Sequence, residues 1–114
     1  MTSDLGPRTS DAASAVAVTV EAVAWVTTFV GGDGSKRRAF PASYPAGTTV
    51  RGALEALAGQ FPKLREALWD ASGQNLAEHI EVLVNDAVLG VQHTLDSPLR
   101  EGDRITLIGA FTGG

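Results

Sequence analysis

The sequence of 114 residues contains no cysteine, and this absence excludes disulfide bonds, thiolate metal sites and a cysteine nucleophile. Histidine is almost as scarce. Neither of the two histidines, His79 and His93, has neighbours in the sequence that would complete a metal site or an acid–base pair. We therefore expect no bound metal ion and no catalytic group belonging to the chain itself.

Positive charge is also in short supply. Nine Lys and Arg residues stand against thirteen Asp and Glu residues, so the net charge is −4. A protein that binds nucleic acid usually gathers Lys and Arg to meet the phosphates, so nucleic acid is not an expected partner. The basic cluster at residues 36–38 follows a glycine-rich turn and is interpreted as the solvated end of a hairpin.

No long hydrophobic run is present. The mostly apolar residues 15–30 include Thr19, Glu21, Thr27 and Thr28, and the run is shorter than the ~20 residues that span a membrane. Residues 1–14 are small and polar and lack the apolar stretch of a signal peptide. We expect a disordered leader at residues 1–14 and a cytoplasmic protein without a membrane partner.

The whole sequence is 44% hydrophobic and 19% charged, a composition that suits one globular domain. We place this domain at residues 15–108. Residues 15–30 are rich in Val, Thr and aromatic residues, which favours a strand. The glycines at residues 31–34 predict a hairpin turn into a second strand at residues 36–40. Pro41 and Pro45 indicate that this second strand is short and lies at a sheet edge.

A helix is predicted next, because apolar residues recur there at the helical period. Thr48 or Thr49 is its expected N-cap, and Pro62 is expected to end it. The apolar stripe consists of Val50, Leu54, Leu57, Ala58 and Phe61. Leu64, Ala67 and Leu68 suggest a further short helical turn.

The second half returns to strands. Ile80, Val82 and Val84 alternate with more polar residues, Asn85-Asp86 marks a turn, and short strands are predicted at residues 88–91 and 104–108. The order β-β-α-β-(β)-β predicts an α+β domain with a mixed sheet of four to five strands and one main helix on one face. Parallel pairing of the first and last strands in mid-sheet would make it a ubiquitin-like β-grasp.

The last six residues, 109–114, read GAFTGG and are expected to form a flexible tail after the final strand. Gly113 and Gly114 have no Cβ, so this segment suits a narrow channel in another protein. Six extended residues reach about 20 Å. A tail without a role is the alternative, because chain ends are often frayed.

Several segments resemble the MoaD/ThiS family of ubiquitin-like sulfur carriers. They are the PAGTTV motif at residues 45–50, LEAL at 54–57, VND at 84–86, LDSPLREGD at 95–103 and the final Gly-Gly. The resemblance covers residues 16–114 and is most specific towards the C-terminal end. The sequence is most similar to the branch of molybdopterin synthase small subunits.

The resemblance implies a function for the tail residues Phe111, Thr112, Gly113 and Gly114. An E1-like adenylating/sulfurtransferase enzyme would use ATP and Mg to adenylate the Gly114 carboxylate, which sulfur then converts to a thiocarboxylate. A sulfur-accepting biosynthetic enzyme would take the sulfur. The chain itself would bind no cofactor and would be a protein co-substrate, or the small subunit of a synthase, rather than an enzyme.

Leu83, Ile108 and Phe111 are the candidate partner-binding residues. Leu83 and Ile108 fall opposite the core-facing positions of their strands, so they either form an exposed patch or lie in a sheet covered on both faces. Two alternative functions remain: a ubiquitin-like modifier that is conjugated to protein lysines, and a non-catalytic β-grasp interaction module. The sequence does not name the sulfur acceptor.

Overall fold

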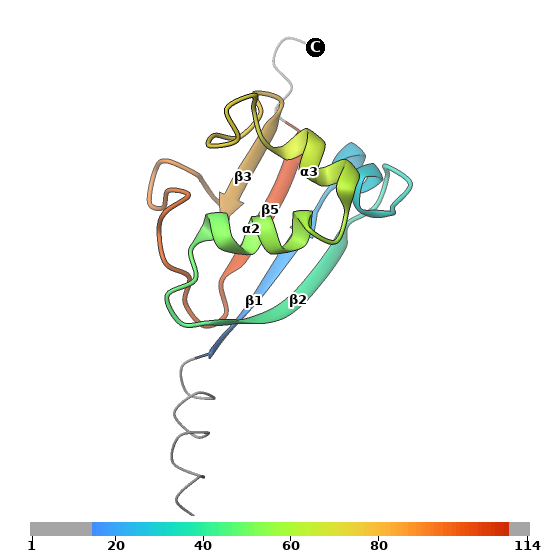
Figure 1. The fold of residues 1–114 in the computed structure, drawn as a ribbon. Helices are drawn as coiled ribbons and strands as arrows, with labels where there is room; N and C mark the ends of the chain where they lie inside the picture. The colour runs from blue at the N-terminus through green and yellow to red at the C-terminus, as the bar shows by residue number, and fades with distance from the viewer. Residues whose placement is uncertain (1–14, 110–114) are drawn as a thin grey trace, which may run out of the picture.

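The structure, a computed structural model, describes residues 15–109, which form a five-stranded mixed sheet with helices on one face (Figure 1). The strand order is β2-β1-β5-β3-β4, and the central pair β1 and β5 is parallel while the other pairs are antiparallel. This arrangement is the predicted β-grasp. In chain order the elements are β1 (Ala15–Ala22), the 3-10 helix η1 (Ala24–Val30), β2 (Arg38–Pro45), α2 (Val50–Ala58), α3 (Pro62–Leu68), β3 (Ile80–Val84), β4 (Ala87–Val88) and β5 (Arg104–Gly109).

The core lies between the sheet and the two α-helices. Alternate residues of the three central strands point towards it, because successive strand side chains face opposite ways. Burying each Val, Leu or Ile contributes about 1.5–3 kcal/mol before the opposing entropy is counted. The strand residues of this core are Val18, Val20, Ala22, Ile80, Val82, Val84, Ile105 and Leu107. They pack with Val50, Leu54, Leu57, Leu64 and Leu68 of the helices.

Helix α2 begins as the sequence predicts. Of the two candidate threonines, Thr49 is the N-cap, and its Oγ1 accepts a hydrogen bond of 3.1 Å from the backbone N–H of Gly52. Thr48 instead donates its hydroxyl to the carbonyl of Pro45 at 2.7 Å. The cap satisfies one of the N–H groups that the first helical turn leaves without an intrahelical partner.

Replacement of Thr49 by alanine should therefore lower the free energy of unfolding by about 1 kcal/mol. Thr48→Ala is the matched control and should cost less than about 0.5 kcal/mol, since water replaces the hydroxyl at the exposed Pro45 carbonyl. Urea unfolding of both variants checks this. Equal losses would show that the hydrogen bond to Gly52 does not stabilise the helix start.

Residues 15–30 do not form one strand, contrary to the prediction. β1 ends at Ala22, Ala24 takes a positive φ of 57°, and the chain turns into η1. Val26, Thr27 and Val30 are all buried, and a helical turn can bury all three, whereas a strand would point the neighbours Val26 and Thr27 to opposite faces. The β propensity of Val, Thr and Phe is thus overridden by burial.

The first connection also differs from the prediction. Gly31, with φ 82°, caps η1 rather than turning a tight hairpin, and Ala22 pairs with Arg38. β2 starts at Arg38 instead of residue 36 and runs for eight residues through Pro41 and Pro45. The edge position was predicted correctly, but the strand is not short. An edge strand tolerates proline because the missing N–H need not be a ladder donor.

The later elements lie close to their predicted places. Asn85 and Asp86 form the turn between β3 and β4, with φ of 52° and 71°, as a hairpin with two left-handed central residues requires. β4 has only two residues instead of the four predicted. Pro62 is the first residue of α3 rather than the end of α2, which stops at Ala58, because proline fits the first helical turn. β5 includes Gly109, which the sequence analysis assigned to the tail.

Candidate functional site: the open sheet face and the base of the tail

The predicted tail residues Phe111, Thr112, Gly113 and Gly114 lie outside the described residues, and so does the leader at residues 1–14. The last described residue is Gly109 at the end of β5, which pairs with Ile80 of β3. Because β1 and β5 are parallel and central, the start of β1 and the end of β5 lie at opposite ends of the sheet (Figure 1). The structure thus places the base of the tail, and the roles of residues 111–114 stay predictions.

Leu83 and Ile108 lie on the face of the sheet opposite α2 and α3. Both are half-buried, and their chain neighbours Val82 and Leu107 point into the core. We call this surface the open face, and its residues alternate with the core residues of their strands. They are Glu21, Glu81, Leu83, Val88, Arg104, Thr106 and Ile108.

One row of the open face crosses the sheet from strand to strand. Glu21 lies beside Thr106, Thr106 beside Leu83, and Leu83 beside Val88, while Ile108 lies beside Glu81 in the next row. Val88 is 43% exposed. Leu83, Val88 and Ile108 therefore form an apolar area to one side of a polar centre, and Phe111 cannot be placed in it because it is outside the described residues.

The polar centre is built around the Glu21 carboxylate, which is only 5% exposed. Its Oε1 accepts a hydrogen bond from the Thr106 hydroxyl at 3.2 Å and lies 3.2 Å from a guanidinium nitrogen of Arg37. Arg104 Nε is 3.9 Å away, and its Nη2 donates to both carboxylate oxygens of Asp86 at 3.0 and 3.1 Å. These partners compensate a charge that burial alone would disfavour.

Sequence reasoning missed Glu21 and Arg37. The signal for Glu21 was a charged residue between the apolar residues Val20 and Ala22. Alternation along the strand places it on the face opposite the core. The prediction of a solvated charge at Arg37 holds for its exposure, but its guanidinium also pairs with Glu21 from the connection before β2. Asp103 is buried as well, where it accepts hydrogen bonds from Asn85 Nδ2 and the Arg100 N–H.

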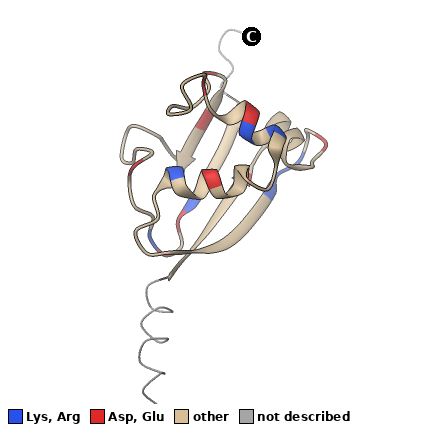
Figure 2. Ribbon diagram, viewed as in Figure 1, with Lys and Arg blue, Asp and Glu red and all other residues tan. Residues whose placement is uncertain are grey.

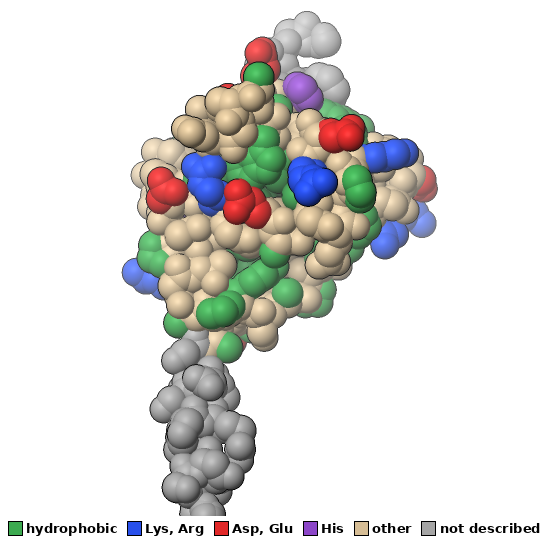
Figure 3. Space-filling model, in the orientation of Figure 1, with side chains coloured by type: hydrophobic (Ala, Val, Ile, Leu, Met, Phe, Trp, Pro, Cys, Tyr) green, Lys and Arg blue, Asp and Glu red, His purple; other side chains and the backbone are tan. Residues whose placement is uncertain are grey.

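The opposite face has a different character. On α2 and α3, positive and negative side chains are interspersed (Figure 2), and the space-filling view shows the same mixture between small apolar areas (Figure 3). Such a mixed charged surface is typical of helices that face water. The open face is therefore the stronger candidate for docking a protein.

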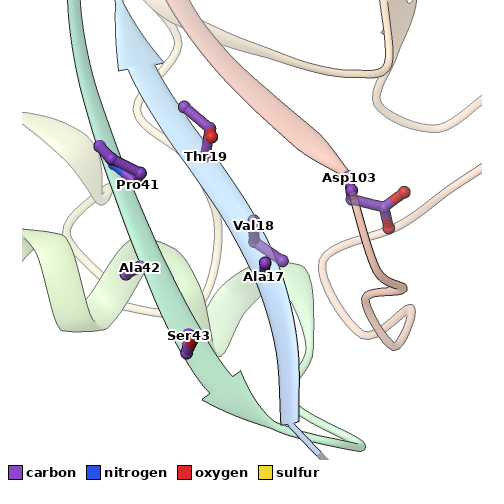
Figure 4. A pocket seen from close by; sticks show the side chains of 8 residues that line it. Ala17, Val18, Thr19, Pro41, Ala42, Ser43 and Asp103 are labelled. Carbon is purple, nitrogen blue, oxygen red and sulfur yellow. The ribbon is translucent and has the colours of Figure 1, made fainter.

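A cavity of about 410 Å³ lies far from the tail base, where β1, β2 and the turn at Gly102 meet. Its lining is mostly small, and the side chain of Asp103 turns away from Thr19 and Pro41 (Figure 4). Asp103 is already engaged by Asn85 and Arg100. The cavity thus offers no free ionisable group for chemistry.

Two kinds of feature are absent from residues 15–109. Across that range, no three His, Asp or Glu side chains gather so as to hold a metal ion. The helices within the same range are too short or too polar to cross a membrane.

Known proteins share the sequence family and the β-grasp fold of this chain. The model of the ThiS family matches residues 36–114. SAMP1 from Haloferax volcanii is 26% identical with a TM-score of 0.68, over 86% of this chain and 99% of its own. Urm1 from Trypanosoma brucei is 25% identical with a TM-score of 0.66, over 88% and 97%.

A third solved structure, the Amycolatopsis orientalis BexX/CysO complex, contains a chain that is 25% identical with a TM-score of 0.60, over 85% of this chain and 99% of that one. A search of curated proteins found no significant match. The family match spans well over half of the sequence and includes its Gly-Gly end. The chain therefore belongs to the ThiS family, the ubiquitin-like sulfur carriers of the MoaD/ThiS type.

Proposed function

We propose that this protein carries sulfur on Gly114 as a C-terminal thiocarboxylate. The observation that carries the proposal is the Gly-Gly end five residues beyond the last residue of β5, in a β-grasp domain of this family. Five extended residues reach at most about 17 Å, enough to enter a partner's active site while the domain stays outside. The terminal glycine leaves the attacked carbonyl without a neighbouring side chain.

The chemistry follows from the weakness of a carboxylate as an electrophile. An E1-like enzyme with Mg-ATP joins AMP to the Gly114 carboxylate and releases pyrophosphate. A persulfide sulfur then attacks the carbonyl and displaces AMP, and a second thiol breaks the sulfur–sulfur bond, which leaves the thiocarboxylate and a disulfide. All catalytic groups in these steps belong to partners, consistent with a family of carriers rather than enzymes.

Partner recognition is proposed to use the open face. Leu83, Val88 and Ile108 supply apolar contact, and the Glu21 centre supplies a fixed charge pattern that a partner of matching charge can read. A chain similar to this one occurs in the BexX/CysO complex, which supports a protein partner. The sulfur-accepting biosynthetic enzyme, of molybdopterin or of another sulfur-containing metabolite, is proposed to use the same surface after the activating enzyme has left.

Val88→Ser tests the surface. The loss of this apolar contact should raise the KM of the activating enzyme for this protein by about fivefold, which corresponds to a loss of about 1 kcal/mol in binding free energy. Val91→Ser is the matched control, because Val91 is 75% exposed in the loop after β4 and should leave the KM unchanged. Equal effects of the two variants would show that the open face does not dock.

A modifier function is the second candidate, supported by the likeness to a small archaeal modifier protein. One experiment separates the possibilities. The protein is incubated with the E1-like enzyme of its own organism, Mg-ATP and a persulfide donor, and intact masses are recorded. Replacement of one oxygen by sulfur supports the carrier. Adducts on other proteins' lysines, without that change, support the modifier. An unchanged mass and no adducts would contradict both and leave a plain interaction module.

A further inference from the structure

Trp25 of η1 lies against the last described residue of β5. β1 runs parallel to β5, and the Val23 N–H donates a hydrogen bond of 3.1 Å to the Leu107 carbonyl, so the chain leaves β1 next to the end of β5. At Ala24 the positive φ turns it sharply into η1. This turn brings the indole of Trp25 across the backbone of Gly109, 84 residues further along the chain.

The contact between Trp25 and Gly109 leaves no room for a side chain. A Cβ added at Gly109 would lie 2.5 Å from Cε2 and 2.7 Å from Cζ2 of the indole, and closer still to Nε1. A Cβ essentially never lies this close to an atom to which it is not bonded. The indole in this position and any residue other than glycine at 109 therefore exclude each other. We call this pair the tail-base contact.

Two further aromatic rings contact the indole. Phe29 meets it edge to face with ring centroids 5.5 Å apart, and His79 stacks on it at 6.3 Å with an interplanar angle of 28°. His79 directly precedes β3, and Ile80 pairs with Gly109. Phe29 of η1, His79 just before β3 and Gly109 of β5 therefore contact one rigid aromatic ring at the point where the tail begins.

We infer that the tail-base contact sets the direction in which residues 110–114 leave the sheet, and that Trp25 is a positioning residue for activation of the terminal carboxylate. The inference rests on the proposed function. A rotation of about 10° at Gly109 moves the far end of five extended residues by about 3 Å. Adenylation needs the carboxylate in attack geometry, so restricting the starting direction raises the fraction of bound molecules that react.

Gly109→Ala is the direct test. The new Cβ displaces the indole, and kcat for adenylation should fall roughly tenfold while KM changes less than twofold, because the open face is unaltered. Gly59→Ala is the matched control: its Cβ would meet only carbonyl oxygens at 3.4 and 3.5 Å at the end of α2, so kcat should be unchanged. Thermal unfolding confirms that each variant is folded.

Trp25→Leu provides a second route if Gly109→Ala does not fold. It should lower kcat by a similar factor, and adding Gly109→Ala to it should cost little more, because the clashing ring is gone. A kcat within twofold of the unmodified protein in a folded single variant, a change confined to KM, or fully additive losses in the double variant would each overturn the inference.

A measurement without any enzyme separates this inference from the proposed function. The Gly109 Hα resonances should be shifted by the indole ring current in NMR spectra, and the shift should disappear in Trp25→Leu. A missing shift overturns the tail-base contact even if the unmodified protein is adenylated. A present shift together with no adenylation of the unmodified protein would instead refute the proposed function and, with it, the positioning role.

Discussion

Deletion of Gly114 is expected to lower the rate of adenylation by at least about a hundredfold, although the shortened chain still ends in a glycine carboxylate. The deletion moves the carboxylate back by about 3.5 Å along an extended chain. An error of that size removes the reacting group from attack geometry, whereas the domain and its open face stay the same. The measurement is ATP–pyrophosphate exchange by the E1-like enzyme.

The control for this prediction removes residues from the other end. Deleting residues 1–14 should leave the exchange rate within twofold, since β1 starts at Ala15, at the end of the sheet remote from Gly109. A Gly114 deletion that is adenylated as fast as the full chain would contradict the account, because the terminal position would then not matter. A leader deletion that abolishes exchange would show that residues 1–14 take part in docking.

Truncation of the core at Leu107 should give the largest loss of stability. Leu107 is fully buried in the central strand β5, and Leu107→Ala should lower the free energy of unfolding by about 3 kcal/mol. Domains of this kind have roughly 5–15 kcal/mol in total, so the variant should unfold at clearly lower urea concentration. The destabilisation has two parts: the removed methyl and methylene groups no longer leave water on folding, and an unfilled cavity remains in the core.

Leu83→Ala is the matched control, because it makes the same substitution on the other face of the sheet. Leu83 is half-buried, so its truncation should cost about 1 kcal/mol. Leu83→Ala should instead weaken the interaction with the activating enzyme. Leu107→Ala should weaken that interaction only in the fraction of molecules that unfolds. Equal destabilisation by the two variants would show that both faces of the sheet are covered, against the assignment of the open face.

The fold was predictable where one local pattern decides the structure. The alternation at Ile80, Val82 and Val84, the helical spacing from Val50 and the left-handed turn at Asn85-Asp86 each determine their element through near neighbours. η1 was missed because its Val, Thr, Trp and Phe residues favour strands. A helical turn is the better solution because Val26, Thr27 and Val30 are all buried where η1 packs against β5, and a strand would point Val26 and Thr27 to opposite faces.

The candidate site was predictable only in part. The faces of Leu83 and Ile108 follow from strand alternation, and the tail roles rest on the family resemblance. The polar centre joins Glu21 to Thr106, and the tail-base contact joins Trp25 to Gly109; in each case the partners are more than eighty positions apart. Such pairs depend on the parallel register of β1 and β5, which no local pattern specifies.

Whether Gly114 carries sulfur is decided by the mass of the C-terminal tryptic peptide, residues 105–114, from protein purified out of its own cells. This peptide contains no methionine or cysteine, because the sequence has no cysteine and its single methionine is Met1. We expect a fraction of this peptide in which one sulfur replaces one oxygen, located at Gly114 by fragmentation. A peptide that carries oxygen only, even after incubation with the E1-like enzyme, Mg-ATP and a persulfide donor, would contradict this expectation.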